Sequence, residues 1–118
     1  MNTKIIGNNG ENQAVTYLLS KGYSIIDRNW RTRTGEIDII AYINETIVFV
    51  EVKTLPNGTV DMIKRELNYQ KQQRILKTSK RFLLNHRQYS NSYVRYDVIV
   101  IDMPGFEKVY HIENAFSE

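Results

Sequence analysis

Two apolar, β-branched segments lie almost back to back in the middle of this 118-residue chain. Residues 37–43 (IDIIAYI) and 46–52 (TIVFVEV) are separated only by Asn44-Glu45. β-Branched residues favour strands, and two such runs joined by a two-residue polar break are typical of a β-hairpin. Because both runs are apolar on both faces, we expect central strands that are covered by helices on either side.

Helical spacing of apolar residues marks the covering helices. The first helix is predicted over residues 11–21, ending at Gly22, after a loop at residues 7–10. Residues 60–86 are also helical in pattern, but their apolar stripe changes direction. We therefore expect two helices there, with a break near Asn68-Tyr69.

Three further apolar segments complete the predicted sheet, at residues 23–30, 93–102 and 108–112. The resulting order, α-β-β-β-α-α-β-β, predicts an α/β fold with a mixed central sheet flanked by helices. A chain of this length fits one domain, over residues 1–118, because a second core would leave each half too small to be stable. No repeat and no linker-like segment divides it.

Composition excludes several classes of protein. The chain contains no cysteine, which rules out disulfides, cysteine zinc sites and a cysteine nucleophile. It has no run of about 18 apolar residues that would span a membrane, and its first ten residues lack the apolar core of a signal peptide. We therefore expect a cytoplasmic protein without a membrane partner.

Each central strand carries one acid in apolar surroundings, Asp38 in the first and Glu51 in the second. An unpaired buried carboxylate is so costly that it needs a cation or takes up a proton. A hairpin that turns at Asn44-Glu45 pairs Ile43 with Thr46 and sets Asp38 directly opposite Glu51. Opposed carboxylates repel unless a cation lies between them, and Mg²⁺ is commonly held this way beside phosphates.

The same register places Glu36 opposite Lys53, and strand alternation puts Lys53 on the face of Glu51. Beside a metal ion, a lysine orients or deprotonates a water, or offsets phosphate charge. The alternatives are a solvated strand end or an ordinary ion pair between Glu36 and Lys53, since an acid-x-Lys pattern is common. A bulge in the hairpin would shift the register and remove the geometric support.

Positive charge is concentrated in residues 64–87, which contain eight basic residues and one acid, Glu66. If the apolar stripe of the second of these helices faces the sheet, five cations lie on its remaining surface: Lys71, Arg74, Lys77, Lys80 and Arg81. Such a stripe suits contact with nucleic-acid phosphates, whereas a merely solvated face usually mixes both signs. Lys71 lies at the edge of the stripe and either reaches toward the acidic strands or is a surface lysine.

A second basic group surrounds the single tryptophan, Trp30, and consists of Arg28, Arg31 and Arg33. Arginines around an aromatic ring suit contact with a nucleic-acid backbone and stacking on its bases. The alternative is that Trp30 is a core residue.

Six motifs follow one another along the chain: Gly7-x-x-Gly10-Glu11-x-x-Ala14, Arg28-Asn29-Trp30-Arg31, Gly35-Glu36-Ile37-Asp38-Ile39-Ile40-Ala41, Val48-Phe49-Val50-Glu51-Val52-Lys53, Arg95-Tyr96-Asp97-Val98 and His111-Ile112-Glu113-Asn114-Ala115-Phe116. In this order and spacing they resemble the YraN-type family of small bacterial proteins. That family is regarded as predicted endonucleases, distantly related to archaeal Holliday-junction resolvases. The resemblance implies a restriction-endonuclease-like fold, named PD-(D/E)XK after its acidic motif.

By this resemblance, Asp38 and Glu51 are expected to bind Mg²⁺ or Mn²⁺ together with the backbone carbonyl of Val52. Lys53 is then the lysine of the catalytic motif. Glu11 is expected to bring a further catalytic acid from the first helix. The alternative for Glu11 is an acid that is favoured by the positive end of the helix dipole.

The function that this resemblance implies is metal-dependent hydrolysis of phosphodiester bonds in DNA that is branched or contains single strands. A homodimer is compatible with junction-like substrates, although no residue marks an interface. The alternative is a non-catalytic module that binds nucleic acid or joins a complex while keeping the nuclease fold.

Overall fold

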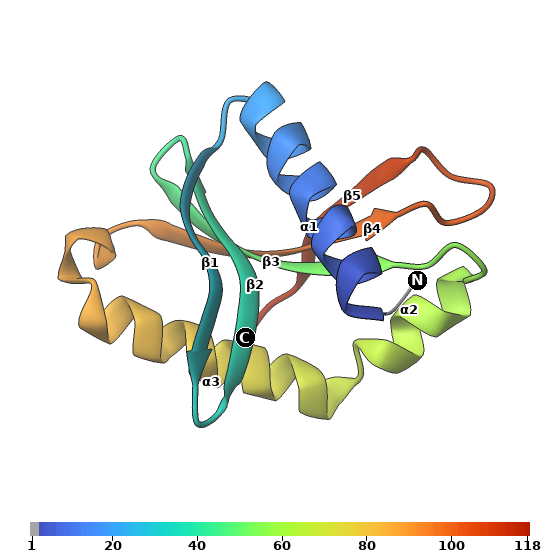
Figure 1. The fold of residues 1–118 in the computed structure, drawn as a ribbon. Helices are drawn as coiled ribbons and strands as arrows, with labels where there is room; N and C mark the ends of the chain where they lie inside the picture. Colours follow the sequence, from blue (N-terminus) through green and yellow to red (C-terminus); the bar gives the residue numbers. More distant parts are fainter. Residues whose placement is uncertain (1–2) are drawn as a thin grey trace.

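A five-stranded sheet flanked by helices forms the centre of this computed structural model (Figure 1). The structure describes the backbone of residues 3–118 and the side chains of residues 9–118. The elements are α1 (Thr3–Ser20), β1 (Ser24–Thr32), β2 (Gly35–Ile43), β3 (Thr46–Thr54), α2 (Val60–Glu66), α3 (Tyr69–Asn85), the 3₁₀ helix η1 (Arg87–Tyr89), β4 (Tyr93–Ile101) and β5 (Val109–Phe116). The predicted order of helices and strands is therefore confirmed.

The strands lie in the order β1-β2-β3-β4-β5, and the sheet is mixed. The pair β3 and β4 is parallel, and α2 and α3 connect these two strands. The other neighbouring strands are antiparallel. The predicted fold class, α/β with a mixed central sheet flanked by helices, is confirmed.

Alternate side chains of the central strands fill two cores, one on each face of the sheet. Val48 and Val50 of β3 pack with residues of α1, whereas Ile47 and Phe49 pack with residues of α3. All four side chains are almost completely buried. Burial on both faces explains why these strands are continuously apolar instead of alternating with polar residues.

The central hairpin turns where the sequence predicts it. Asn44-Glu45 adopts positive φ angles of 47° and 60°, which suit a two-residue hairpin turn, and Ile43 pairs with Thr46. The predicted register holds through the ladder as far as the pair Ile39 and Val50. Beyond that pair, β2 leaves β3 and follows β1 across α3 (Figure 1).

The first helix begins earlier than the sequence indicates. The predicted loop at residues 7–10 is wrong, because α1 begins at Thr3 and continues through these residues. Gly10 serves close packing here rather than a turn, since a Cβ at this position would collide with Thr54 Oγ1. The predicted end of the helix is confirmed, with Gly22 at a φ of 92° directly after the last turn.

The predicted break between two helices is also confirmed. Helix α2 ends at Glu66, and α3 begins at Tyr69 after Asn68, whose side chain accepts a hydrogen bond of 3.0 Å from the Lys71 backbone N–H. This is a regular N-cap, and it lets α3 turn its own apolar stripe toward the sheet. Among the described residues, no helix is long and apolar enough to cross a membrane.

Candidate active site

Asp38 and Glu51 lie where β2 separates from β3. The Asp38 carboxylate occupies the opening between the strands, and its Oδ2 accepts a hydrogen bond of 2.8 Å from the Val52 backbone N–H. Burial raises the pKa of Asp38, the adjacent Glu51 carboxyl raises it further, and the Val52 N–H offsets part of this, so that the pKa reaches about 7. The two acids are therefore neighbours, as predicted, although both lie beyond the last pair of the ladder.

The divergence of the strands also separates the second predicted pair. Glu36 does not meet Lys53 but lies with its Oε2 3.3 Å from Arg31 Nε. The twist of adjacent strands accumulates along a hairpin, so a register that is set at the turn does not keep distant residues opposed. The ion pair of Glu36 with Lys53 that we considered from the sequence is thus replaced by one within the β1–β2 hairpin.

Two lysines approach the buried carboxylate of Glu51. The Nζ atoms of Lys53 and Lys71 lie 3.7 Å and 3.8 Å from Glu51 Oε1, and Lys53 is also 3.7 Å from Glu66 Oε2. Lys71 belongs to the first turn of α3, so the predicted reach of this lysine toward the acidic strands is present. Among the described residues, no lysine or arginine lies within ion-pair distance of Asp38, which is consistent with its raised pKa.

Glu11 reaches the neighbourhood of Asp38 from the middle of α1. Its Oε1 accepts hydrogen bonds from Arg28 Nε at 3.2 Å and from Asn29 Nδ2 at 2.9 Å. Burial raises the pKa of Glu11, the Arg28 hydrogen bond opposes this, and the Asp38 charge raises it again. Because α1 begins at Thr3, Glu11 is far from the first turn, so a role in the helix dipole does not account for it.

The donor set fits a hard divalent cation such as Mg²⁺ or Mn²⁺. Within residues 9–118, no group of three or more histidine, cysteine, aspartate or glutamate side chains is arranged to hold a metal. The side chains that could bind a metal ion at this opening are Asp38 and Glu51, next to the backbone of Val52. A site with two carboxylates that leaves positions for water and phosphate oxygens is what Mg²⁺ commonly uses.

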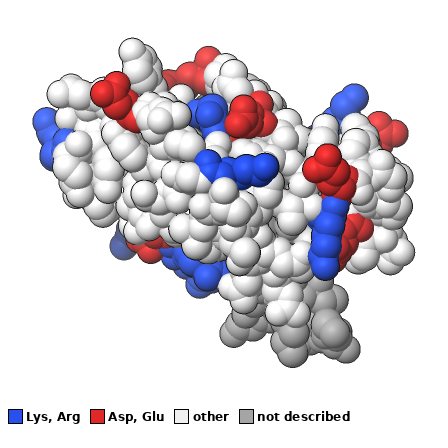
Figure 2. Space-filling view, turned by 90° about the horizontal axis from the view of Figure 1, so that it is seen from above, with Lys and Arg blue, Asp and Glu red and all other residues white. Residues whose placement is uncertain are grey.

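The eight cations that were predicted to bind nucleic acid fall into two groups. Four of them form ion pairs with carboxylates of the same chain, namely Arg28 with Glu11, Arg31 with Glu36, Lys71 with Glu51 and Lys80 with Glu118. The other four are exposed and form no ion pair among the described residues: Arg33, Arg74, Lys77 and Arg81. On the face seen from above, opposite α3, positive and negative side chains are interspersed (Figure 2).

Trp30 is half-buried between the core and the surface. Its ring packs edge-on against Phe82 of α3, with ring centroids 5.2 Å apart, next to the apolar cluster on that face. Trp30 also lines a hollow on the surface. The arginines around Trp30 remain at the surface, and two of them, Arg31 and Arg33, share this hollow with α3.

One buried polar cluster was not predicted as a site. Asp97 of β4 is completely buried and accepts hydrogen bonds from Arg95 Nη2 at 2.8 Å, from His111 Nε2 at 2.7 Å and from the Asn114 N–H at 2.9 Å. Burial raises the pKa of Asp97, but the hydrogen bonds from His111 and Arg95 outweigh it, so the pKa lies below its usual value. The signal for it in the sequence is an acid in an apolar strand, as for Asp38.

His111 also lies 3.2 Å from the hydroxyl of Tyr17, so the Asp97 cluster ties β4 and β5 to α1. This arrangement orders the helix that carries Glu11. We therefore read the cluster as a support of the acidic site and not as a second centre.

The fold and site together define an α/β domain with a mixed five-stranded sheet, carrying an acidic pair next to two lysines at a sheet opening. The model of Uncharacterised protein family UPF0102 matches residues 10–101. The chain belongs to this family, the YraN-type family indicated by its motifs.

Relatives from distant bacteria are similar over nearly their whole length. A UPF0102 protein of Alkaliphilus oremlandii (strain OhILAs) is 49% identical, with 98% of this chain and 100% of that protein covered. Those of Treponema denticola and Persephonella marina are 42% and 41% identical, with 96% and 95% of this chain and 95% and 93% of the relatives covered. The chain therefore spans the same domain as these proteins.

Proposed function

We propose that the protein is a Mg²⁺- or Mn²⁺-dependent endonuclease that hydrolyses phosphodiester bonds in DNA, with branched or single-strand-containing DNA as substrate. The observation that carries this proposal is the meeting of Asp38 and Glu51 at the opening between β2 and β3, beside Lys53 and Lys71. The mixed sheet flanked by helices is compatible with the restriction-endonuclease-like fold. Exposed cations on α3 and on the β1–β2 turn supply positive charge for the substrate.

In this proposal Asp38, Glu51 and the carbonyl of Val52 would hold the cation. When bound, it would supply Lewis-acid chemistry at the phosphate and a more acidic water. Lys53 and Lys71, already next to Glu51, place two ammonium groups where negative charge develops on the phosphate. Glu11, which is held by Arg28 and Asn29 close enough to Asp38 for their charges to interact, would hold a proton during the reaction.

The central experiment is a cleavage assay on flap, junction and single-stranded DNA, with a titration of Mg²⁺ and Mn²⁺. We expect wild type to cut at least one of these substrates. Asp38→Asn should abolish cleavage while leaving DNA affinity intact or improved, because it removes negative charge without changing the shape of the site. Glu36→Gln is the matched control, since this acid of the same strand pairs with Arg31 and should be cleavage-neutral.

A second candidate function, a DNA-binding module without catalysis, is favoured by one observation. Glu51 already has two lysine partners, so its charge is partly compensated without a metal ion. If wild type binds these DNAs but cuts none of them, and neither Mg²⁺ nor Mn²⁺ raises its melting temperature, the binding module is the correct function.

A further inference from the structure

A basic hollow lies between the tip of the β1–β2 hairpin and the C-terminal half of α3. It has a volume of about 340 Å³ and is lined by Trp30, Arg31, Arg33, Thr34, Arg81 and Asn85, among others. We name it the arginine hollow after its three guanidinium groups. The structure thereby joins the two basic groups of the sequence, which are about 50 residues apart, into a single surface feature.

A chain of threonine hydroxyls fastens the two walls of the arginine hollow together. The buried Thr78 hydroxyl of α3 donates to the Arg74 carbonyl at 2.8 Å, so it accepts from the Thr34 hydroxyl, which lies 2.9 Å away. The Thr34 hydroxyl in turn accepts from Thr32 at 2.8 Å, and the Thr34 N–H donates back to the Thr32 hydroxyl at 3.1 Å. The hairpin tip is therefore held on α3 before any ligand arrives, which lowers the entropic cost of binding.

The positive charge of the arginine hollow is only partly compensated. Arg31 shares its charge with Glu36 at 3.3 Å. Arg33 and Arg81 are exposed, and in the described part of the chain neither has a carboxylate within ion-pair distance. Guanidinium groups repel one another unless an anion lies between them, and their planar fork suits phosphate oxygens.

The hollow lies at a defined distance from the acidic pair. Thr34 precedes Asp38 by four residues, and the segment between them runs along β2, so the separation is about 13 Å at a strand rise of ~3.3 Å per residue. The rise of about 3.4 Å per nucleotide is measured along the axis of B-form DNA, whereas each strand winds around that axis, so successive phosphates are farther apart in space than this rise. Roughly two nucleotides therefore span the distance from the hollow to the carboxylates.

We propose that the arginine hollow binds backbone phosphodiester groups of a DNA strand, about two nucleotides from the bond that Asp38 and Glu51 address. The position relative to a cleaved bond rests on the proposed function. The binding of phosphodiester groups does not, because it depends only on the charge and the rigidity of the hollow.

The test is a fluorescence-anisotropy titration of a labelled 12-nucleotide single-stranded DNA in EDTA, at several salt concentrations between 50 and 200 mM. The variant is the double substitution Arg33→Gln with Arg81→Gln. Each lost phosphate contact lowers the slope of log K against log [salt] by about 0.7 for single strands, so we expect a loss of about 1.4 and a roughly tenfold or greater loss of affinity. Unchanged slope and affinity would overturn the proposal.

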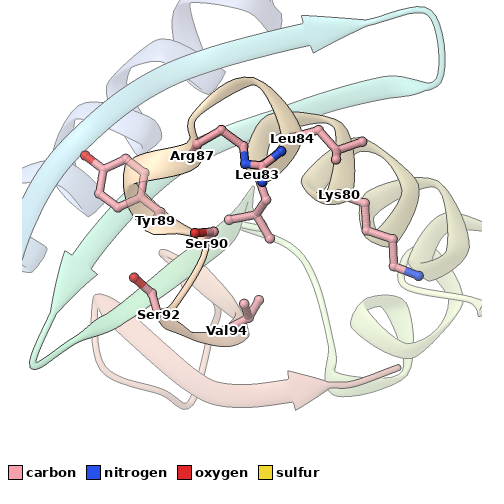
Figure 3. A pocket seen from close by; sticks show the side chains of 8 residues that line it. All are labelled: Lys80, Leu83, Leu84, Arg87, Tyr89, Ser90, Ser92 and Val94. Carbon is pink, nitrogen blue, oxygen red and sulfur yellow. The ribbon is translucent and has the colours of Figure 1, made fainter.

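Arg87 of η1, just beyond the C-terminal end of α3, provides a control that lies outside the hollow. It lines a different cavity, of about 470 Å³, together with Leu83, Leu84 and Val94, and the close view shows this arginine among apolar side chains and serines (Figure 3). Arg87→Gln removes the same charge as one of the test substitutions. We expect it to leave the salt slope unchanged. A loss of about 0.7, half that of the double variant, would show that the effect of the double variant is only one of net charge.

A cleavage assay distinguishes failure of this proposal from failure of the proposed function. If wild type does not cut DNA but the double variant has a smaller salt slope, the hollow binds phosphates and the protein is not a nuclease. If wild type cuts DNA and the double variant binds and cuts like wild type, the protein is a nuclease and the hollow does not bind the substrate. Where cutting occurs, a substrate that ends directly after the cleaved bond on the hollow side does not reach the hollow and should be cut equally by both proteins. A persistent difference would refute the assigned distance.

Discussion

Asp38→Asn is expected to stabilise the metal-free protein at alkaline pH. The pKa of Asp38 rises from its ordinary value of 3.8 to about 7 in the folded state, because the carboxyl is buried next to Glu51. The folded state therefore keeps a proton that the unfolded state releases, and stability falls as the pH rises from about 4 to 7. At about 1.4 kcal/mol for each pH unit, the cost approaches 4 kcal/mol above pH 7.

Asparagine removes this cost and keeps the main contact. Its carbonyl oxygen can still accept the hydrogen bond from the Val52 N–H, and its amide group can donate to Glu51. In EDTA we expect the variant to be more stable than wild type by about 2–4 kcal/mol at pH 8, and to differ from it by less than about 1 kcal/mol at pH 4. Urea denaturation at the two pH values, with the m-value checked for constancy, measures the difference.

A metal titration supplies the second half of this prediction. At a Mn²⁺ or Mg²⁺ concentration one hundred times the dissociation constant, wild type should gain about 2.7 kcal/mol at pH 8, and the variant should gain nothing. Glu36→Gln should show at most a small part of the pH effect and no change in the metal effect, because Glu36 is the smallest contributor to the raised pKa of Asp38 and pairs with Arg31. The reasoning is refuted if Asp38→Asn is less stable than wild type at pH 8, or if its advantage is the same at both pH values.

Two further predictions concern the support of the site. Gly10→Ala should lose about 1–3 kcal/mol of stability, because the new Cβ would collide with Thr54 Oγ1. Adding Thr54→Ala should restore most of this loss. A double-mutant cycle that shows no coupling between the two sites contradicts the prediction. Asp97→Asn should cost about 3 kcal/mol or more at pH 7, because it leaves the Arg95 charge with only the longer ion pair of 3.7 Å to the exposed Glu113. The pKa of Asp97 in the folded state lies below its ordinary value of 3.8. The stability that the Asp97 carboxylate contributes is therefore fully present above pH 3.8 and is lost as the pH falls below it. Urea unfolding between pH 2 and 7 should show the stabilities of wild type and variant converging in acid.

Local chemistry was sufficient to predict most elements of the fold. The β-branched runs and the Asn44-Glu45 break specify the central hairpin, and Asn68 marks the start of α3 because its side chain caps the helix. The loop at residues 7–10 was predicted wrongly, since glycine usually interrupts helices. Only the packed structure shows that Gly10 is required for the close approach of α1 to Thr54.

The two acids of the site were predicted from the cost of burying charge. The residues that pair with these acids were predicted less completely. Asp38 and Glu51 stand out because carboxylates in apolar strands need compensation, and the structure places them together. The predicted pairing of Glu36 with Lys53 is absent. The prediction assumed that the register set at the turn continues to these residues, but the strands separate before reaching them. The role of Arg28 in holding Glu11 joins two elements and has no signature in either segment.

The sequence by itself determined which segments are strands and helices, which faces are apolar, and that two acids in apolar strands need a compensating cation or proton, since these follow from the properties of neighbouring residues along the chain. The tertiary structure alone decided where β2 separates from β3, that Lys53 and Lys71 meet at Glu51, and that Arg33 and Arg81 share one hollow. Such contacts depend on the twist of the sheet and on how α3 crosses the hairpin. Both are properties of the whole packed molecule, because each small local rotation is summed over many residues before distant side chains meet.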